Sequence, residues 1–157
     1  MRLKPRVLIS LAVAGAIAAF ATVAFAQSGH FVGTPTCTDQ GTTVSCSGKV
    51  AGLGGTTFSI NVNAQGTASV TCTNPGGNVA PGQSFTFNAT GGTGTLPTPR
   101  NGSYNFRNVS TTTPSAPAGS CPNDMWTATV TDVKFTSATI TLTEDSTVSD
   151  TITVPVT

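Results

Sequence analysis

Trp126-Thr-Ala-Thr-Val-Thr-Asp-Val-Lys-Phe-Thr-Ser-Ala-Thr-Ile-Thr-Leu142 is the stretch that decides the fold. Apolar residues alternate with threonine from Trp126 to Val130, and apolar residues again alternate with hydroxyl residues from Ala138 to Leu142. Successive side chains of a strand point to opposite faces, so this period of two predicts one buried face and one wet face. The stretch therefore predicts two strands of a half-buried antiparallel sheet. Between them Val133 and Phe135 fall on odd positions, which a β-bulge or a corner between sheets would produce.

The rest of the chain shows the same pattern in shorter pieces. A turn is expected at Gln65-Gly66 and a loop at Asn74–Gly82 because of their glycine and proline content. Further strands are expected at 34–38, 42–47, 56–63, 67–73, 84–90, 102–109 and 148–156. Eight or nine short strands separated by turn residues are typical of an immunoglobulin-like antiparallel β-sandwich with Greek-key connections, or of a related Greek-key barrel.

Residues 1–26 have the features of a cleaved N-terminal signal peptide. Three basic residues precede a long apolar run, and Ala24-Phe25-Ala26 supplies a cleavage signature. An uncleaved membrane anchor is the alternative, because the run approaches the length of a bilayer span. We expect cleavage after Ala26, a single domain at 27–157, secretion, and no stable membrane insertion after cleavage.

The charge of residues 27–157 excludes one class of partner. Without the three basic residues of the signal segment, four basic and six acidic residues remain, a net charge of −2. Nucleic-acid-binding domains carry a basic footprint. We therefore expect no nucleic-acid partner.

All four cysteines lie after residue 26, which fits an oxidising compartment. Four cysteines allow three pairings, and we prefer Cys37–Cys46 and Cys72–Cys121. A zinc or redox site is the functional alternative. No Cys-x-x-Cys is present and His30 is the only histidine, so we expect disulfides and no metal or other cofactor.

Catalytic residues are hard to find in this sequence. A Ser-His-Asp arrangement would have to use His30, close to the start of the domain. The acids are Asp39, Asp124, Asp132, Glu144, Asp145 and Asp150. All fall at expected turns or strand ends, where carboxylates commonly cap turns and are solvated, although a hydrolase pair or a calcium site remains the alternative. We expect a protein that is not an enzyme.

Three stretches are candidates for binding. The segment Arg100–Arg107 combines Arg100, Tyr104 and Arg107, residue types that are frequent in contact hot spots, and the loop Asn74–Gly82 is a second candidate. The threonine rows at 127–131, 139–143 and 151–153 could form a flat hydroxyl array for ice or polysaccharide. Threonine is also the ordinary residue for the wet face of a sheet, and without a sequence repeat we prefer that interpretation.

Trp126 has two possible roles. It shares its parity with Ala128 and Val130 and follows Cys121 closely, so we expect it in the core, packed on a disulfide. The alternative is an exposed platform on which a sugar ring stacks.

The segments 51–55, 70–82 and 121–126 resemble those of a group of small secreted proteins from high-GC Gram-positive bacteria. The resemblance implies secretion and a β-sandwich, and it implies no particular activity. The enediyne-binding chromoproteins share that origin and a two-disulfide sandwich, but their cysteine spacing differs from the second pair here, so no ligand is carried across.

These observations predict a secreted, non-enzymatic β-sandwich binding module whose partner is a cell surface, a polysaccharide, a protein or a small ligand. The alternatives are a structural or self-associating cell-surface protein that uses its exposed edge strands, and a hydrolase that uses turn carboxylates.

Overall fold

The computed structural model describes residues 28–157, so the expected signal peptide at 1–26 lies outside the described residues. Every helix or strand assigned in the described part is a strand, which confirms the all-β class. The strands are β1 (His30–Phe31), β2 (Thr36–Asp39), β3 (Val44–Ala51), β4 (Thr57–Thr73), β5 (Val79–Pro81), β6 (Phe85–Gly92), β7 (Leu96–Pro97), β8 (Ser103–Ser110), β9 (Thr127–Glu144) and β10 (Thr147–Pro155).

The strands form two antiparallel sheets. In the smaller sheet β3 pairs with β1, β2 and β8. In the larger sheet β4 pairs along its whole length with β9, which in turn pairs with β10. The other edge of β4 pairs in succession with β7, β6 and β5.

The core lies between the two sheets. Phe58, Ile60 and Ile140 of the larger sheet pack in one buried cluster with Val50 and Phe106 of the smaller sheet. These side chains come from the apolar positions of the period-two pattern, so burying them stabilises the expected face of each strand.

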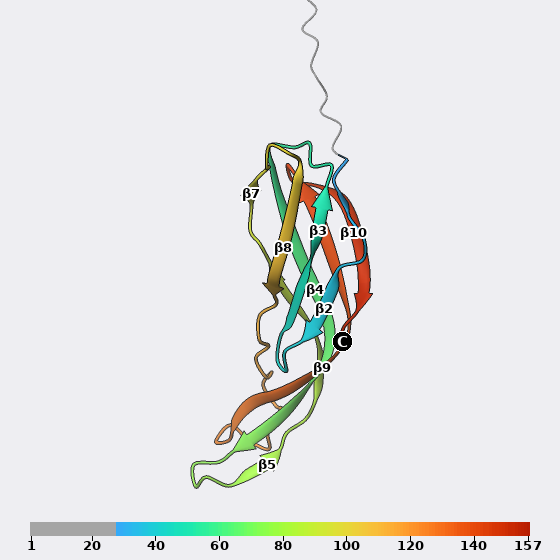
Figure 1. The fold of residues 1–157 in the computed structure, drawn as a ribbon. Coiled ribbons are helices and arrows are strands. Elements are labelled where there is room, and N and C mark those ends of the chain that lie inside the picture. The colour runs from blue at the N-terminus through green and yellow to red at the C-terminus, as the bar shows by residue number, and fades with distance from the viewer. Residues whose placement is uncertain (1–27) are drawn as a thin grey trace, which may run out of the picture.

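The strands β4 and β9 are longer than the sequence suggested. The expected turn at Gln65-Gly66 is wrong, because β4 runs through it without a break, and the two strands expected within 126–142 are one strand. Beyond the two-sheet body, the far ends of β4 and β9 continue into an arm that carries β5 (Figure 1). The loop expected at Asn74–Gly82 therefore contains a short strand.

Two irregularities in the pairing of β9 with β4 explain the shifted parity of Val133 and Phe135. The register shifts between Ser69 and Val70, and again between Gln65 and Gly66. One extra residue of β9 at each shift reverses which parity faces inward. Val133 and Phe135 are consequently buried, and the even positions from Ala138 to Leu142 are buried beyond the second shift.

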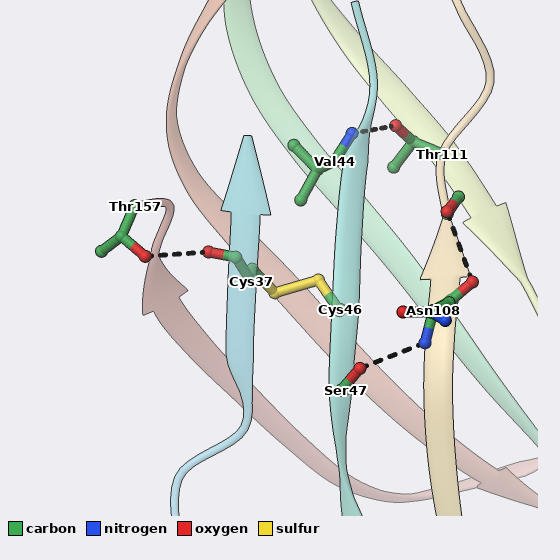
Figure 2. The surroundings of a disulfide bond; sticks show 8 residues. Cys37, Val44, Cys46, Ser47, Asn108, Thr111 and Thr157 are labelled. Carbon is green, nitrogen blue, oxygen red and sulfur yellow. Dashed lines mark hydrogen bonds between the residues drawn. A yellow bond between two sulfur atoms is a disulfide. The ribbon is translucent and has the colours of Figure 1, made fainter. Parts of the chain in front are cut away.

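Both preferred disulfides, Cys37–Cys46 and Cys72–Cys121, are present. Cys37–Cys46 joins β2 to β3, and the C-terminal Thr157 donates its hydroxyl to the carbonyl of Cys37 (Figure 2). The chain after β10 in this way links the larger sheet to the edge of the smaller one. Cys72–Cys121 ties β4 in the arm to the segment before β9.

Candidate binding face

The outer face of the larger sheet carries a block of uncharged polar side chains across four neighbouring strands, with Val148 and Pro155 at its β10 edge and Lys134 and Asp132 beyond it on β9. We call this block the outer polar face, and it consists of Ser59, Asn61, Asn63 and Gln65 of β4, Asn88 and Thr90 of β6, Ser137, Thr139, Thr141 and Thr143 of β9, and Thr151 and Thr153 of β10. These residues point outward because their neighbours in sequence, such as Ile60, Val62 and Ile140, fill the core.

Strand register arranges these side chains in rows across the sheet. One row runs Thr153, Thr139, Asn63, Thr90, since each of these residues is paired with the next. Adjacent rows place Thr151, Thr141 and Asn61 in line, and Ser137, Gln65 and Asn88 in line. Rows across strands repeat at about 4.8 Å, and successive rows on one face lie roughly 7 Å apart. The order arises from pairing between distant segments, so no sequence repeat is needed.

The outer polar face is not flat, and some of its side chains hydrogen-bond to each other. Two shallow hollows of about 380 Å³ each lie on it, and both are lined by Asn63, Thr139 and Thr141. The hydroxyls of Thr139 and Thr153 lie 2.9 Å apart and hydrogen-bond to each other. Amides and hydroxyls each supply both donors and acceptors, so the face suits a ligand that also carries both.

The sequence-predicted residues Arg100, Tyr104 and Arg107 lie away from this face. Arg100 is exposed in the turn between β7 and β8, and Arg107 is exposed on β8 of the smaller sheet. Tyr104 is half-buried, and its ring lies 5.1 Å from that of Phe58 in an edge-to-face contact. The side chains of Tyr104 and Arg107 thus leave β8 on opposite faces.

The structure brings together only part of the predicted threonine rows. Those at 139–143 and 151–153 join the outer polar face, whereas the row at 127–131 lies in the arm. Sequence reasoning missed Asn61, Asn63 and Gln65. The available signal was their alternation with Ile60, Val62 and Ala64, which has the same period of two.

Glu144 is not a solvated residue, contrary to the sequence interpretation, whereas Asp145 is exposed in a turn as expected. Glu144 is fully buried at the end of β9, where it accepts hydrogen bonds from the backbone N–H groups of Gly29, Gly54 and Gly55 and from the Ser149 hydroxyl. Burial raises the pKa of this carboxyl, but the four hydrogen bonds outweigh burial, so the pKa lies below its ordinary value of 4.5.

Asp145 occupies a two-residue hairpin turn between β9 and β10. Both Asp145 and Ser146 have positive φ, as a type I′ turn requires. The Asp145 carboxylate accepts hydrogen bonds from the hydroxyl and backbone N–H of Thr56 and from those of Thr57. The Thr56 hydroxyl above all lowers the pKa of Asp145 far below its ordinary value. Both acids therefore hold neighbouring loops in place.

Trp126 is not in the core, so the preferred interpretation is wrong. It lies just before β9, is half-buried, and lines an open hollow of about 330 Å³ together with Asn123, Asp124 and the segment 116–121. The main core cluster extends along β4 only as far as Ala68, and Val130 packs against its edge. Trp126 lies beyond this end of the cluster, where Val70 and Cys72 are the buried apolar residues of β4, so few side chains remain to enclose an indole.

Within residues 28–157 there is no group of three or more His, Cys, Asp or Glu side chains that could hold a metal ion. The same residues contain no helix with the length and apolar character needed to cross a membrane. The comparisons found no matching family model, no matching curated protein and no matching solved structure.

Proposed function

We propose that the chain is a secreted, non-enzymatic binding module that holds uncharged polysaccharide against the outer polar face. The observation that carries this proposal is a block of twelve outward amide and hydroxyl side chains on four adjacent strands, which is bordered by Val148 and Pro155 on β10 and by Lys134 in the next row of β9. Ordinary protein surfaces intersperse charged side chains of both signs. A neutral polyhydroxylated chain supplies matching donors and acceptors without requiring an ion to lose its hydration.

The geometry favours polysaccharide over ice, the other ligand of a hydroxyl array. The two hollows at Asn63, Thr139 and Thr141 break the flatness that a crystal plane would require. Saccharide units are irregular in outline, and shallow hollows of this kind can seat protruding hydroxyls.

Secretion and a non-enzymatic role are part of the proposal. The two disulfides are consistent with an extracellular protein. The outer polar face contains no carboxylate, thiol or imidazole that could act as acid, base or nucleophile. We also propose that the fold is of the immunoglobulin-like Greek-key type, supported by the long connections that return β8 to β3 and β9 to β4.

Binding isotherms on insoluble polysaccharides test this function. Cellulose, chitin and purified bacterial cell walls are incubated with the disulfide-bonded protein, and the free protein is measured after sedimentation. The double variant Thr139→Ala/Thr141→Ala removes two central hydroxyls. We expect its affinity for the retained polymer to fall about tenfold, since each hydrogen bond contributes about 0.5–1.5 kcal/mol.

The matched control is Thr127→Ala/Thr129→Ala, which makes the same change on exposed residues at the arm end of β9. It should bind as the wild type does. Equal affinity of the test and control variants would refute the assignment of this face. Absence of binding to all three polymers, with concentration-dependent self-association instead, would favour the structural role.

A further inference from the structure

The hollow beside Trp126 is a preformed site on the arm, distant in the fold from the outer polar face. Its backbone rim at 116–121 is anchored by the disulfide from Cys121 to Cys72. Ser120 is buried, its hydroxyl donates to the carbonyl of Pro117 at 2.8 Å, and its carbonyl accepts from the N–H of Gln83 at 2.9 Å. The rim therefore holds its shape before any ligand arrives, which lowers the entropy cost of binding.

The opposite rim is held just as closely. The backbone N–H of Trp126 donates to the carbonyl of Asn123 at 3.1 Å, and the N–H of Met125 donates to the side-chain Oδ1 of Asn123 at 3.0 Å. These bonds fix the backbone of Trp126 relative to Asn123. They also use the amide oxygen of Asn123, so the amide NH₂ is the group that this side chain offers to a ligand.

The lining combines one aromatic ring with a few polar groups. Most of the exposed lining is polar; Trp126 supplies its one aromatic ring, Ala116, Pro117 and Ala128 supply small apolar contacts, and Asp124 supplies a carboxylate that can accept several hydrogen bonds. A volume of about 330 Å³ lies at the lower end of the range for small-molecule sites. The C–H face of a pyranose ring is apolar and its rim carries hydroxyls, which matches this division of the lining.

We propose that the Trp126 hollow binds a single pyranose unit that carries no negative charge. The ring stacks on Trp126, two of its hydroxyls donate to the carboxylate of Asp124, and the amide of Asn123 donates to a ring substituent. Asp124 is the one charged residue in the lining, and it disfavours uronic acids and other anionic sugars. This site does not rest on the proposed function of the outer polar face.

Tryptophan fluorescence tests the site directly, because Trp126 is the only tryptophan in the chain. The disulfide-bonded protein is titrated with the methyl glycosides of glucose, galactose, mannose and N-acetylglucosamine, and with glucuronic acid as the anionic comparison. We expect a saturable change in emission for at least one neutral glycoside, with a Kd on the order of 1 mM, and no saturable change for glucuronic acid.

Two variants locate the signal. Asp124→Asn keeps the size of the side chain and should weaken binding about tenfold, because a charged acceptor is lost. Trp126→Leu removes the fluorescent reporter, so its binding is measured by ligand-observed NMR, and we expect binding to be abolished. The melting temperature of Trp126→Leu shows whether this variant folds. Asp124→Asn keeps Trp126 and can be followed by fluorescence. Thr139→Ala/Thr141→Ala on the outer polar face should bind the glycoside as the wild type does.

A flat emission titration with every neutral glycoside would overturn the site, and so would binding that survives both Asp124→Asn and Trp126→Leu. A glycoside signal lost in Thr139→Ala/Thr141→Ala but kept in Asp124→Asn would assign the sugar to the other face. Failure of the polymer isotherms leaves this titration unaffected, so the two proposals are separable.

Discussion

Replacing Glu144 by glutamine tests how the buried carboxylate contributes to stability. One oxygen of Glu144 accepts from the N–H groups of Gly54 at 2.7 Å and Gly55 at 3.1 Å. The other accepts from the N–H of Gly29 at 3.0 Å and from the Ser149 hydroxyl at 2.7 Å. Glu144→Gln keeps the shape of the side chain and turns one of these oxygens into a donor.

The least costly arrangement places the new NH₂ group toward Gly29 and Ser149, since the Ser149 hydroxyl can rotate and accept. The N–H of Gly29 then loses its partner, which costs about 1–3 kcal/mol, and the bonds from Gly54 and Gly55 lose their charged acceptor. We expect the free energy of unfolding to fall by about 2–4 kcal/mol. Urea unfolding at neutral pH, followed by circular dichroism, measures this change.

The pH dependence gives an independent reading of the same interaction. The pKa of Glu144 is lowered in the folded state, so the carboxyl takes up a proton more readily in the unfolded chain. The contribution of the Glu144 carboxylate to the free energy of unfolding is complete above the ordinary pKa of 4.5. It is lost as the pH falls through the lower pKa that Glu144 has in the folded state. The variant should therefore lose less stability than the wild type over this acidic window.

Asp132→Asn is the control, because Asp132 is an exposed acid on the same strand. It should change the free energy of unfolding by less than about 0.5 kcal/mol. The reasoning about Glu144 fails if Glu144→Gln is as stable as this control, or if Glu144→Gln loses stability in acid as steeply as the wild type and the control do.

Three further predictions concern the frame around the proposed sites. On the loop-entropy model, replacing Cys72 and Cys121 by alanine should lower the free energy of unfolding by about 4 kcal/mol, and replacing Cys37 and Cys46 should lower it by about 3 kcal/mol. Only the loss of Cys72–Cys121 should shift the Trp126 emission, because Cys121 lines the hollow beside Trp126. Gly66→Ala should destabilise by about 1–3 kcal/mol in urea unfolding, because its Cβ would lie 2.7 Å from a methyl of Val133, whereas the exposed Thr67→Ala should be nearly neutral. Asp145→Ala should lower the melting temperature at neutral pH, because the N–H groups of Thr56 and Thr57 lose their carboxylate acceptor, and an unchanged melting temperature would show that the turn holds without it.

The local pattern predicted those parts of the fold that depend on neighbours in sequence. The alternation in 126–142 identified the wet and buried positions, and the odd parity of Val133 and Phe135 indicated a bulge. The pairing Cys72–Cys121, which ties a strand in the middle of the chain to the segment before the Trp126 strand, was also predicted and is present.

Other parts depend on contacts that the linear sequence does not reveal. Gln65-Gly66 has the composition of a turn, but Gly66 is buried under Val133 and Phe135, where any side chain would collide. The glycine is there for close packing within a continuous strand. Glu144 was assigned to solvent because its N–H partners come from Gly29, Gly54 and Gly55, which lie far away in the chain.

The outer polar face could not be predicted from the sequence for a related reason. Each of its strands has polar outward residues, which is ordinary for a sheet with one wet face. Only the register of β10, β9, β4 and β6 shows that their hydroxyls and amides fall in common rows. The side-chain type was readable from the sequence, and the array was not.

Chemical-shift mapping with a soluble oligosaccharide of the retained polymer tests the central claim most directly. The side-chain NH₂ groups of Asn61, Asn63 and Gln65 are exposed reporters on the outer polar face. We predict that their resonances, together with the backbone amides of Thr139 and Thr141, shift in a saturable manner. Shifts confined to the segment Arg100–Arg107, with these five residues unchanged, would contradict the account.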